Sequence, residues 1–208
     1  FAEVLKPAGY VAAAAGKWQV NDFRVEPHAM RKHGFDDWCL WTGYETGNPP
    51  SGERYWDPYI NTPEGSRTYE GRFGPDVFTD FLIEFMERHK GEPMMLYYPM
   101  VLTHGPFTTT PDEPDANGNL AKHKAMVRYT DELVGRLVHA LDDNGLRENT
   151  IVIFTTDNGS TRGITGTLNG RKVAGAKALK TEPGVCAPFI VSGPGLVPPG
   201  VVTDALTD

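Results

Sequence analysis

The chain of 208 residues carries 20 basic and 27 acidic side chains, which gives a net charge of −7. This length suits one domain, and the acidic balance argues against a nucleic-acid partner, because phosphate binding requires a basic surface. No apolar run approaches the roughly 20 residues of a membrane span, so we expect no membrane partner. Cys39 and Cys186 form no C-x-x-C pair, and we expect buried free thiols rather than a disulfide.

The N-terminal third predicts a helix end, a turn, a buried strand and then a long irregular segment. Pro7 and Gly9 stop the helix, and the small apolar residues 10–15 are typical of a strand covered on both faces. Residues 21–72 are rich in Gly, Pro, Asn and aromatic residues, which indicates an insertion of long ordered loops around one strand near residues 38–41.

The rest of the chain alternates between helical and strand patterns. The predicted elements are, in order, a helix at 74–90, a strand at 94–101, a helix around 126–141, a strand at 151–156 and a short strand within 185–195. The β-branched run at 151–156 is suited to a central parallel strand. This alternation predicts an α/β fold with a mostly parallel central sheet flanked by helices.

Polar residues follow three of the predicted strands. Lys17 follows the first strand, His104 follows the strand at 94–101, and Asp157 and Asn158 follow the strand at 151–156. Ligand sites in open α/β sheets lie at the carboxyl ends of the strands. We therefore expect these side chains to converge on one crevice.

Each of these residues also has a purely structural interpretation. Asp157 and Asn158 offer oxygen ligands that suit Ca²⁺ or Mg²⁺, but Asp-Asn-Gly is also an ordinary turn after a strand. His104 is a candidate general acid, metal ligand or anion donor, or else a capped loop histidine. Lys17 and Lys177 could hold an anion or be solvated surface residues. The sequence contains no nucleophile motif of the G-x-S-x-G or Walker type.

Four stretches, in this order and over nearly the whole chain, resemble the sulfatase family of the alkaline-phosphatase-like superfamily. "LKPAGYVAAAAGKWQV" is similar to the Gly-Tyr…Gly-Lys-Trp signature, and "THGPF" is similar to the histidine-proline loop. "YTDELVGRLVHALDDNGLRENTIVIFTTDNG" resembles the helix, Asn-Thr turn and Asp-Asn-Gly strand of the family. "GAKALKTEPGVCAPFIVSGPG" resembles its Gly-x-Lys…Glu-x-Gly…Pro-Phe segment.

The resemblance implies a sulfatase fold, hydrolysis of sulfate esters and a role for each matching residue. Lys17 and Lys177 match lysines that hold the sulfate and the hydrated formylglycine, and His104 matches a histidine that faces the ester as a candidate proton donor. Asp157 and Asn158 match two metal ligands, usually for Ca²⁺, with Mg²⁺ as the alternative. The family usually has histidine where this chain has Gln19, and an amide cannot act as a base.

The resemblance also implies parts that this sequence does not contain. The family nucleophile is a formylglycine made from a Cys/Ser-x-Pro-x-Arg motif, and neither cysteine here lies in such a motif. We expect the nucleophile upstream, so that residues 1–208 form a truncated, partial sulfatase catalytic domain that is inactive alone. A truncated sheet would leave an unpaired strand edge and exposed apolar surface, from which we expect self-association.

The resemblance leaves three functional readings open. The parent protein is expected to hydrolyse sulfate esters of a sulfated small molecule or sulfated carbohydrate, in a periplasmic or secreted location. A phosphate or phosphonate ester hydrolase on the same scaffold is one alternative. A non-catalytic, degenerate sulfatase-like domain is the other, motivated by Gln19 and by the missing nucleophile.

Overall fold

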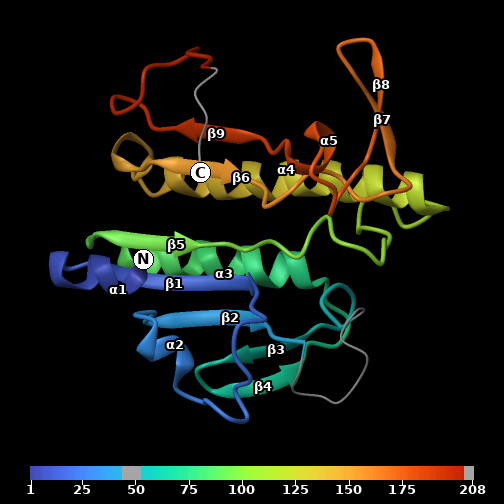
Figure 1. Ribbon diagram of the computed structural model, residues 1–208. Coiled ribbons are helices and arrows are strands. Elements are labelled where there is room, and N and C mark those ends of the chain that lie inside the picture. Colours follow the sequence, from blue (N-terminus) through green and yellow to red (C-terminus); the bar gives the residue numbers. More distant parts are fainter. Residues whose placement is uncertain (44–52, 204–208) are drawn as a thin grey trace. The chain divides into compact units, whose positions relative to one another are not determined.

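The structure, a computed structural model, describes residues 1–43 and 53–203 and divides into two compact units, Phe1–Asn144 and Gly145–Asp208 (Figure 1). Unit 1 contains α1 (Ala2–Leu5), the 3₁₀ turn η1 (Lys6–Ala8), β1 (Val11–Lys17), α2 (Ala29–Lys32), β2 (Asp37–Trp41), β3 (Tyr59–Thr62), β4 (Gly65–Thr68), α3 (Gly74–His89), β5 (Met94–Tyr97) and α4 (Asn119–Asp143). Unit 2 contains η2 (Arg147–Asn149), β6 (Val152–Thr155), β7 (Thr165–Leu168), β8 (Arg171–Ala174), α5 (Glu182–Val185) and β9 (Phe189–Ser192). None of the helices in the described ranges has both the length and the apolar character that a membrane crossing requires.

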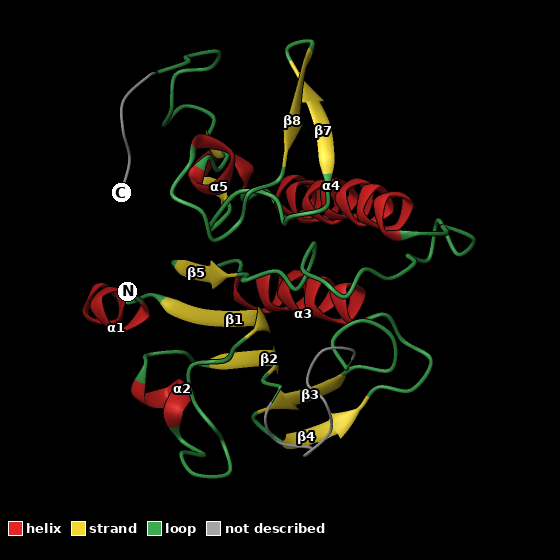
Figure 2. Ribbon diagram, turned by 45° about the vertical axis from the view of Figure 1, so that its right-hand side comes forward, coloured by secondary structure: helices red, strands yellow, loops and turns green. Residues whose placement is uncertain are grey.

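Unit 1 is built on a five-stranded sheet with the strand order β4-β3-β2-β1-β5. β1 pairs in parallel with both β2 and β5, whereas β3 and β4 form an antiparallel hairpin at one edge (Figure 2). The predicted α/β class is therefore confirmed. Because β1, β2 and β5 are parallel, their carboxyl ends lie at one edge of the sheet.

Alternate residues of β2 pack on opposite faces of this sheet. Trp38 and Leu40 join an apolar cluster with residues of α1 and α2, whereas Cys39 and Trp41 join a cluster with residues of α3. This alternation follows from the two-residue period of a strand. The alanines of β1 are fully buried, as the small apolar run at 10–15 predicted.

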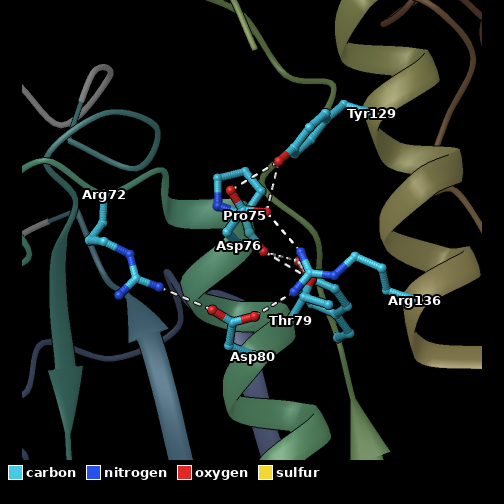
Figure 3. A network of polar contacts seen from close by, with 8 residues as sticks. Arg72, Pro75, Asp76, Thr79, Asp80, Tyr129 and Arg136 are labelled. Carbon is cyan, nitrogen blue, oxygen red and sulfur yellow. Dashed lines mark hydrogen bonds and ion pairs between the residues drawn. The ribbon is translucent and has the colours of Figure 1, made fainter. Parts of the chain in front are cut away.

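A network of polar contacts fixes α4 to the start of α3 (Figure 3). The hydroxyl of Tyr129 donates to both carboxylate oxygens of Asp76, at 2.8 and 2.9 Å. Arg136 donates to Asp76 at 2.9 Å and also to Asp80, which receives a further bond from Arg72 at 3.0 Å. Burial and the Asp76 carboxylate both raise the pKa of Tyr129, so its hydroxyl stays protonated as a donor. Charged acceptors make such bonds stronger than neutral ones.

Unit 2 differs from the predicted strand arrangement. β6 confirms the predicted strand near residues 151–156, but within this unit its partner is the antiparallel β9, whereas parallel neighbours were predicted. Ile153 is 59% exposed, and Phe189 and Ile190 of β9 are exposed as well. A β-branched run indicates a strand but not the direction of its partner, which explains the error. Self-association through such apolar surface stays a prediction.

Unit 1 also departs from the prediction in two places. The strand at 94–101 ends at Tyr97, since Pro99 has no N–H group to continue a ladder. The segment 21–72 contains α2 and the β3–β4 hairpin in addition to the predicted strand, and residues 44–52 of it lie outside the described residues.

The prediction of two buried thiols is half right. Both cysteines are free thiols, but only Cys39 is buried, whereas Cys186 is exposed. Burial raises the pKa of the Cys39 thiol far above its usual value.

Candidate functional site

Lys17 is the last residue of β1, at the edge of the sheet where the strands end. Its backbone N–H donates to the carbonyl of Pro99 at 2.7 Å, which ties β1 to the segment after β5. Gly16 makes this approach possible: its φ is +109°, and a Cβ there would lie 2.3 Å from the Pro99 oxygen. Glycine alone fits both the dihedral angle and the short distance.

His104 lies further along the same segment, on a loop that is hydrogen-bonded to Arg54 and Tyr55. Tyr55 donates its hydroxyl to the carbonyl of Val101 at 2.9 Å and also to that of His104. Arg54 places its Nη2 3.1 Å from the Nδ1 of His104 and donates to the carbonyl of Gly105. The loop is therefore held by two adjacent residues from a distant part of the sequence.

Arg54 and Tyr55 are functional candidates that the sequence reasoning missed. They lie in the segment predicted as loop, where a helical or strand period gives no signal. The burial of Arg54 would have indicated a special role, but burial cannot be read from a single sequence.

Gln19 lies beside the end of β2. A Cβ on Gly43, which follows β2, would be 2.8 Å from the Gln19 Nε2. The next backbone contact, from Trp18 N–H to the Trp41 carbonyl at 2.8 Å, holds the two strand ends together. Gln19 thus stays with Lys17 at the carboxyl end of the parallel strands.

Asp157 and Asn158 lie just after β6, separated from it by Thr156, and close backbone packing fixes the loop that carries them. The N–H of Gly159 donates to the Gly184 carbonyl at 3.0 Å, and a Cβ on Gly159 would lie 2.1 Å from the Pro183 oxygen. The chain bends at Asp157 and Asn158, and the glycine that follows is needed for close contact with the Pro183 backbone.

A second contact brings Lys177 to the same loop. Its backbone N–H donates to the carbonyl of Ser160 at 3.0 Å. A hollow of about 380 Å³ follows from this arrangement, lined by Asn158, Lys177, Ala178, Leu179, Lys180, Gly184 and Val185. Two predicted site residues, Asn158 and Lys177, thus meet in one concave surface.

The oxygen atoms of Asp157 and Asn158 are of the chemical type that a hard cation prefers. The carboxylate of Asp157 and the amide oxygen of Asn158 are ligands that Ca²⁺ and Mg²⁺ accept, although Ca²⁺ takes six to eight oxygens. The described residues contain no group of three or more His, Cys, Asp or Glu side chains placed to hold a metal ion. These two residues would therefore form part of a cation site.

The predicted site residues fall into two groups. Lys17, Gln19 and His104 belong to unit 1, where the ends of β1, β2 and the segment after β5 bring them to one edge. Asp157, Asn158 and Lys177 belong to unit 2, where one loop system holds them. Their convergence on a single crevice stays a prediction.

The chain is similar in sequence and in structure to known proteins. The Sulfatase family model matches residues 1–208. The N-acetylgalactosamine-6-sulfatase of Canis lupus familiaris is 31% identical over 221 residues, which cover 98% of this chain and 41% of that protein. The chain therefore spans less than half the length of this curated relative.

Two solved structures share the fold. Ps i-CgsB has a TM-score of 0.72 at 23% identity, over 95% of this chain and 48% of that one. BT4656, solved in complex with its substrate D-glucosamine-2-N,6-O-disulfate, has a TM-score of 0.67 at 19% identity, over 93% of this chain and 55% of that one. At these identities the similarity establishes the fold alone.

Proposed function

Because the chain belongs to the sulfatase family, we propose that it supplies part of the active site of a sulfate ester hydrolase. The observation that carries this proposal is the meeting of Lys177 and Asn158 in one hollow of unit 2. A cationic side chain beside a cation ligand is the arrangement that an anionic substrate requires.

We propose that two lysines stabilise negative charge in the reaction. A sulfate ester carries negative charge on its oxygens, and more charge develops on the leaving oxygen as the S–O bond breaks. Positive groups that are already in place stabilise this charge without reorganisation during the reaction. We assign this role to Lys17 and Lys177.

Two groups from outside the described residues complete the proposal. A Ca²⁺ or Mg²⁺ ion at Asp157 and Asn158 would polarise the sulfate oxygens as a Lewis acid. Formylglycine, which the family resemblance implies as the nucleophile, would supply a hydroxyl group for attack at sulfur. Gln19 can orient either partner by hydrogen bonding, but its amide cannot take up a proton.

His104 is assigned to the leaving-group side of the ester. Its Nδ1 lies 2.7 Å from the Gly105 carbonyl and 3.1 Å from Arg54, and we assign the opposite nitrogen, Nε2, to the substrate. From there the imidazole can donate a hydrogen bond or a proton to the departing oxygen.

A sulfated carbohydrate is the proposed substrate. The names of two similar proteins support this class, one a sulfatase of N-acetylgalactosamine 6-sulfate and the other solved with a disulfated glucosamine. The identity of the sugar and the position of its sulfate group are open to experiment.

The test measures sulfate release by the full-length parent protein. Ion chromatography would follow free sulfate from N-acetylgalactosamine 6-sulfate, with p-nitrophenyl sulfate as a second substrate. Lys177→Ala and Asp157→Ala are each expected to lower kcat/KM by about 10²-fold or more, because each removes charge stabilisation from the site.

The matched control is Lys172→Ala, which removes a lysine from the exposed β8 strand of the same unit. It should leave sulfate release unchanged. Full activity in both site variants would overturn the proposal. Release of phosphate from p-nitrophenyl phosphate, with no release of sulfate, would favour the phosphate-ester alternative instead.

A further inference from the structure

Arg54 is a buried cation in the loop region of unit 1. It is 4% exposed, although arginine is rarely fully buried unless it is paired. Within residues 1–43 and 53–203, no carboxylate forms an ion pair with it, and its Nε has no hydrogen-bond partner. Burial of a charge without full compensation destabilises a fold. A role other than stabilising the fold would therefore explain why an arginine occupies this buried position.

Aromatic faces compensate only part of this cost. The guanidinium carbon lies 4.7 Å from the ring centre of Trp41 and 5.2 Å from that of Tyr55. Such cation–π contacts are attractive, and more so when they are desolvated. Trp41 ends β2 in register with Lys17, so the guanidinium rests on a rigid part of the sheet at the functional edge.

The remaining contacts of Arg54 are with the histidine loop. Its Nη2 lies 3.1 Å from the Nδ1 of His104 and donates to the Gly105 carbonyl. A guanidinium group has only donors and is always charged. In one tautomer of His104, Nδ1 accepts from Arg54; in the other, Nδ1 donates to the Gly105 carbonyl at 2.7 Å. Because Arg54 can only donate, it favours the tautomer in which Nδ1 accepts and Nε2 carries the proton.

Tyr55 fixes the backbone at the same point. Its hydroxyl donates to the carbonyls of Val101 and His104. Burial raises the pKa of Tyr55, which keeps the hydroxyl protonated as a donor. Adjacent residues thus hold the side chain and the main chain of His104.

We propose that Arg54 is a positioning residue, which orients the His104 imidazole through Nδ1 so that Nε2 faces the sulfate ester. This inference rests on the proposed role of His104 in ester hydrolysis. Arg54 acts through His104 and does not itself touch the substrate.

A double-mutant cycle in the full-length protein tests this role. Arg54→Met keeps much of the side-chain volume and removes the guanidinium group. We expect kcat/KM for sulfate release to fall by about 10²-fold, mostly in kcat, because misplacing a catalytic group by about 1 Å costs that much. In a His104→Ala background, the same substitution should cost less than about twofold further, since coupled residues are not additive.

Chemical rescue separates positioning from general stabilisation. In Arg54→Ala, millimolar guanidinium ion should restore part of kcat, because the Trp41 and Tyr55 rings still offer a stacking site for a planar cation. Urea, which is planar but neutral, should not. The matched control is Arg67→Met, which removes an exposed arginine stacked on Tyr69 and should leave kcat unchanged.

The outcomes separate this inference from the proposed function. A wild-type protein that releases no sulfate would refute the function itself. An active wild type with additive losses in the cycle, or with no rescue by guanidinium, would refute the positioning role alone. If Arg54→Met does not fold, Arg54→Lys serves in its place, because lysine keeps the charge but lacks the planar fork.

Discussion

The close approach of a single glycine decides how the loop that carries Asp157 and Asn158 packs in unit 2. At Gly159, the carbonyl of Pro183 occupies the place where any side chain would begin, 2.1 Å from the ideal Cβ. The opposing atom is backbone, which cannot rotate away as a side chain would. The positions of Asp157 and Asn158 therefore depend on the absence of one methyl group.

Gly159→Ala should accordingly destabilise unit 2. Forcing an extra methyl group into a well-packed site costs about 1–3 kcal/mol. Urea unfolding followed by circular dichroism would measure the change in the free energy of unfolding. Gly166→Ala is the matched control, because a Cβ there meets nothing within 4 Å. Equal midpoints for the two variants would contradict the close packing described at Gly159.

Some candidate site residues can be predicted from the sequence and others cannot. Residues that follow predicted strands, such as Lys17 and Asp157, could be placed because strand ends are functional edges in an α/β sheet. Arg54 could not, since its importance comes from burial and from contact with a histidine 50 residues away. Such a long-range contact leaves no period in the local sequence.

Two helices of unit 1 pack against each other through charged side chains. α3 and α4 are joined by the Asp76 and Asp80 carboxylates, which receive bonds from Tyr129 and Arg136. These bonds connect the first turn of α3 to the middle of α4, so the helix that precedes unit 2 is fixed by polar as well as apolar contacts.

Tyr129→Phe should weaken this junction. The substitution removes a donor from a carboxylate, and a hydrogen bond to a charged group contributes about 1.5–3 kcal/mol. The expected result is a loss of that size in the free energy of unfolding of the whole chain, measured in urea. Tyr69→Phe provides the control, because in the described part of the chain that hydroxyl accepts from an exposed arginine, Arg67, at 3.4 Å. The network would have no energetic role if both substitutions had the same effect.

Element types were more predictable than element partners. The apolar spacing at 126–141 and the Pro75 start signal gave two helices that the structure confirms. β6 pairs antiparallel with β9 where parallel neighbours were predicted, because a short apolar run fits a buried strand of either kind of sheet. Long-range pairing depends on contacts that no local segment encodes.

Over the whole molecule, each of the two units carries one thiol in a different environment. Cys39 is buried in the sheet of unit 1, and Cys186 is exposed in unit 2. Thiolate is the reactive form of cysteine, and burial keeps the Cys39 thiol protonated by raising its pKa. The two residues should therefore report on the two units separately.

We expect one thiol per chain to react with Ellman's reagent under native conditions. That thiol should be Cys186, and Cys186→Ser should abolish the fast phase. Cys39 should react only when urea unfolds unit 1, because the reagent cannot reach a buried thiol. Two fast-reacting thiols in the native protein would contradict the burial of Cys39.

The contact between Arg54 and His104 also bears on how this protein can be recombined with its relatives. The two residues are 50 positions apart, and a chimera whose crossover falls between them would join an arginine from one parent to a histidine loop from another. The distance between Arg54 and the Nδ1 of His104 would then depend on backbone segments that come from two different proteins. Gene shuffling in this family should therefore exchange residues 54–105 as one block.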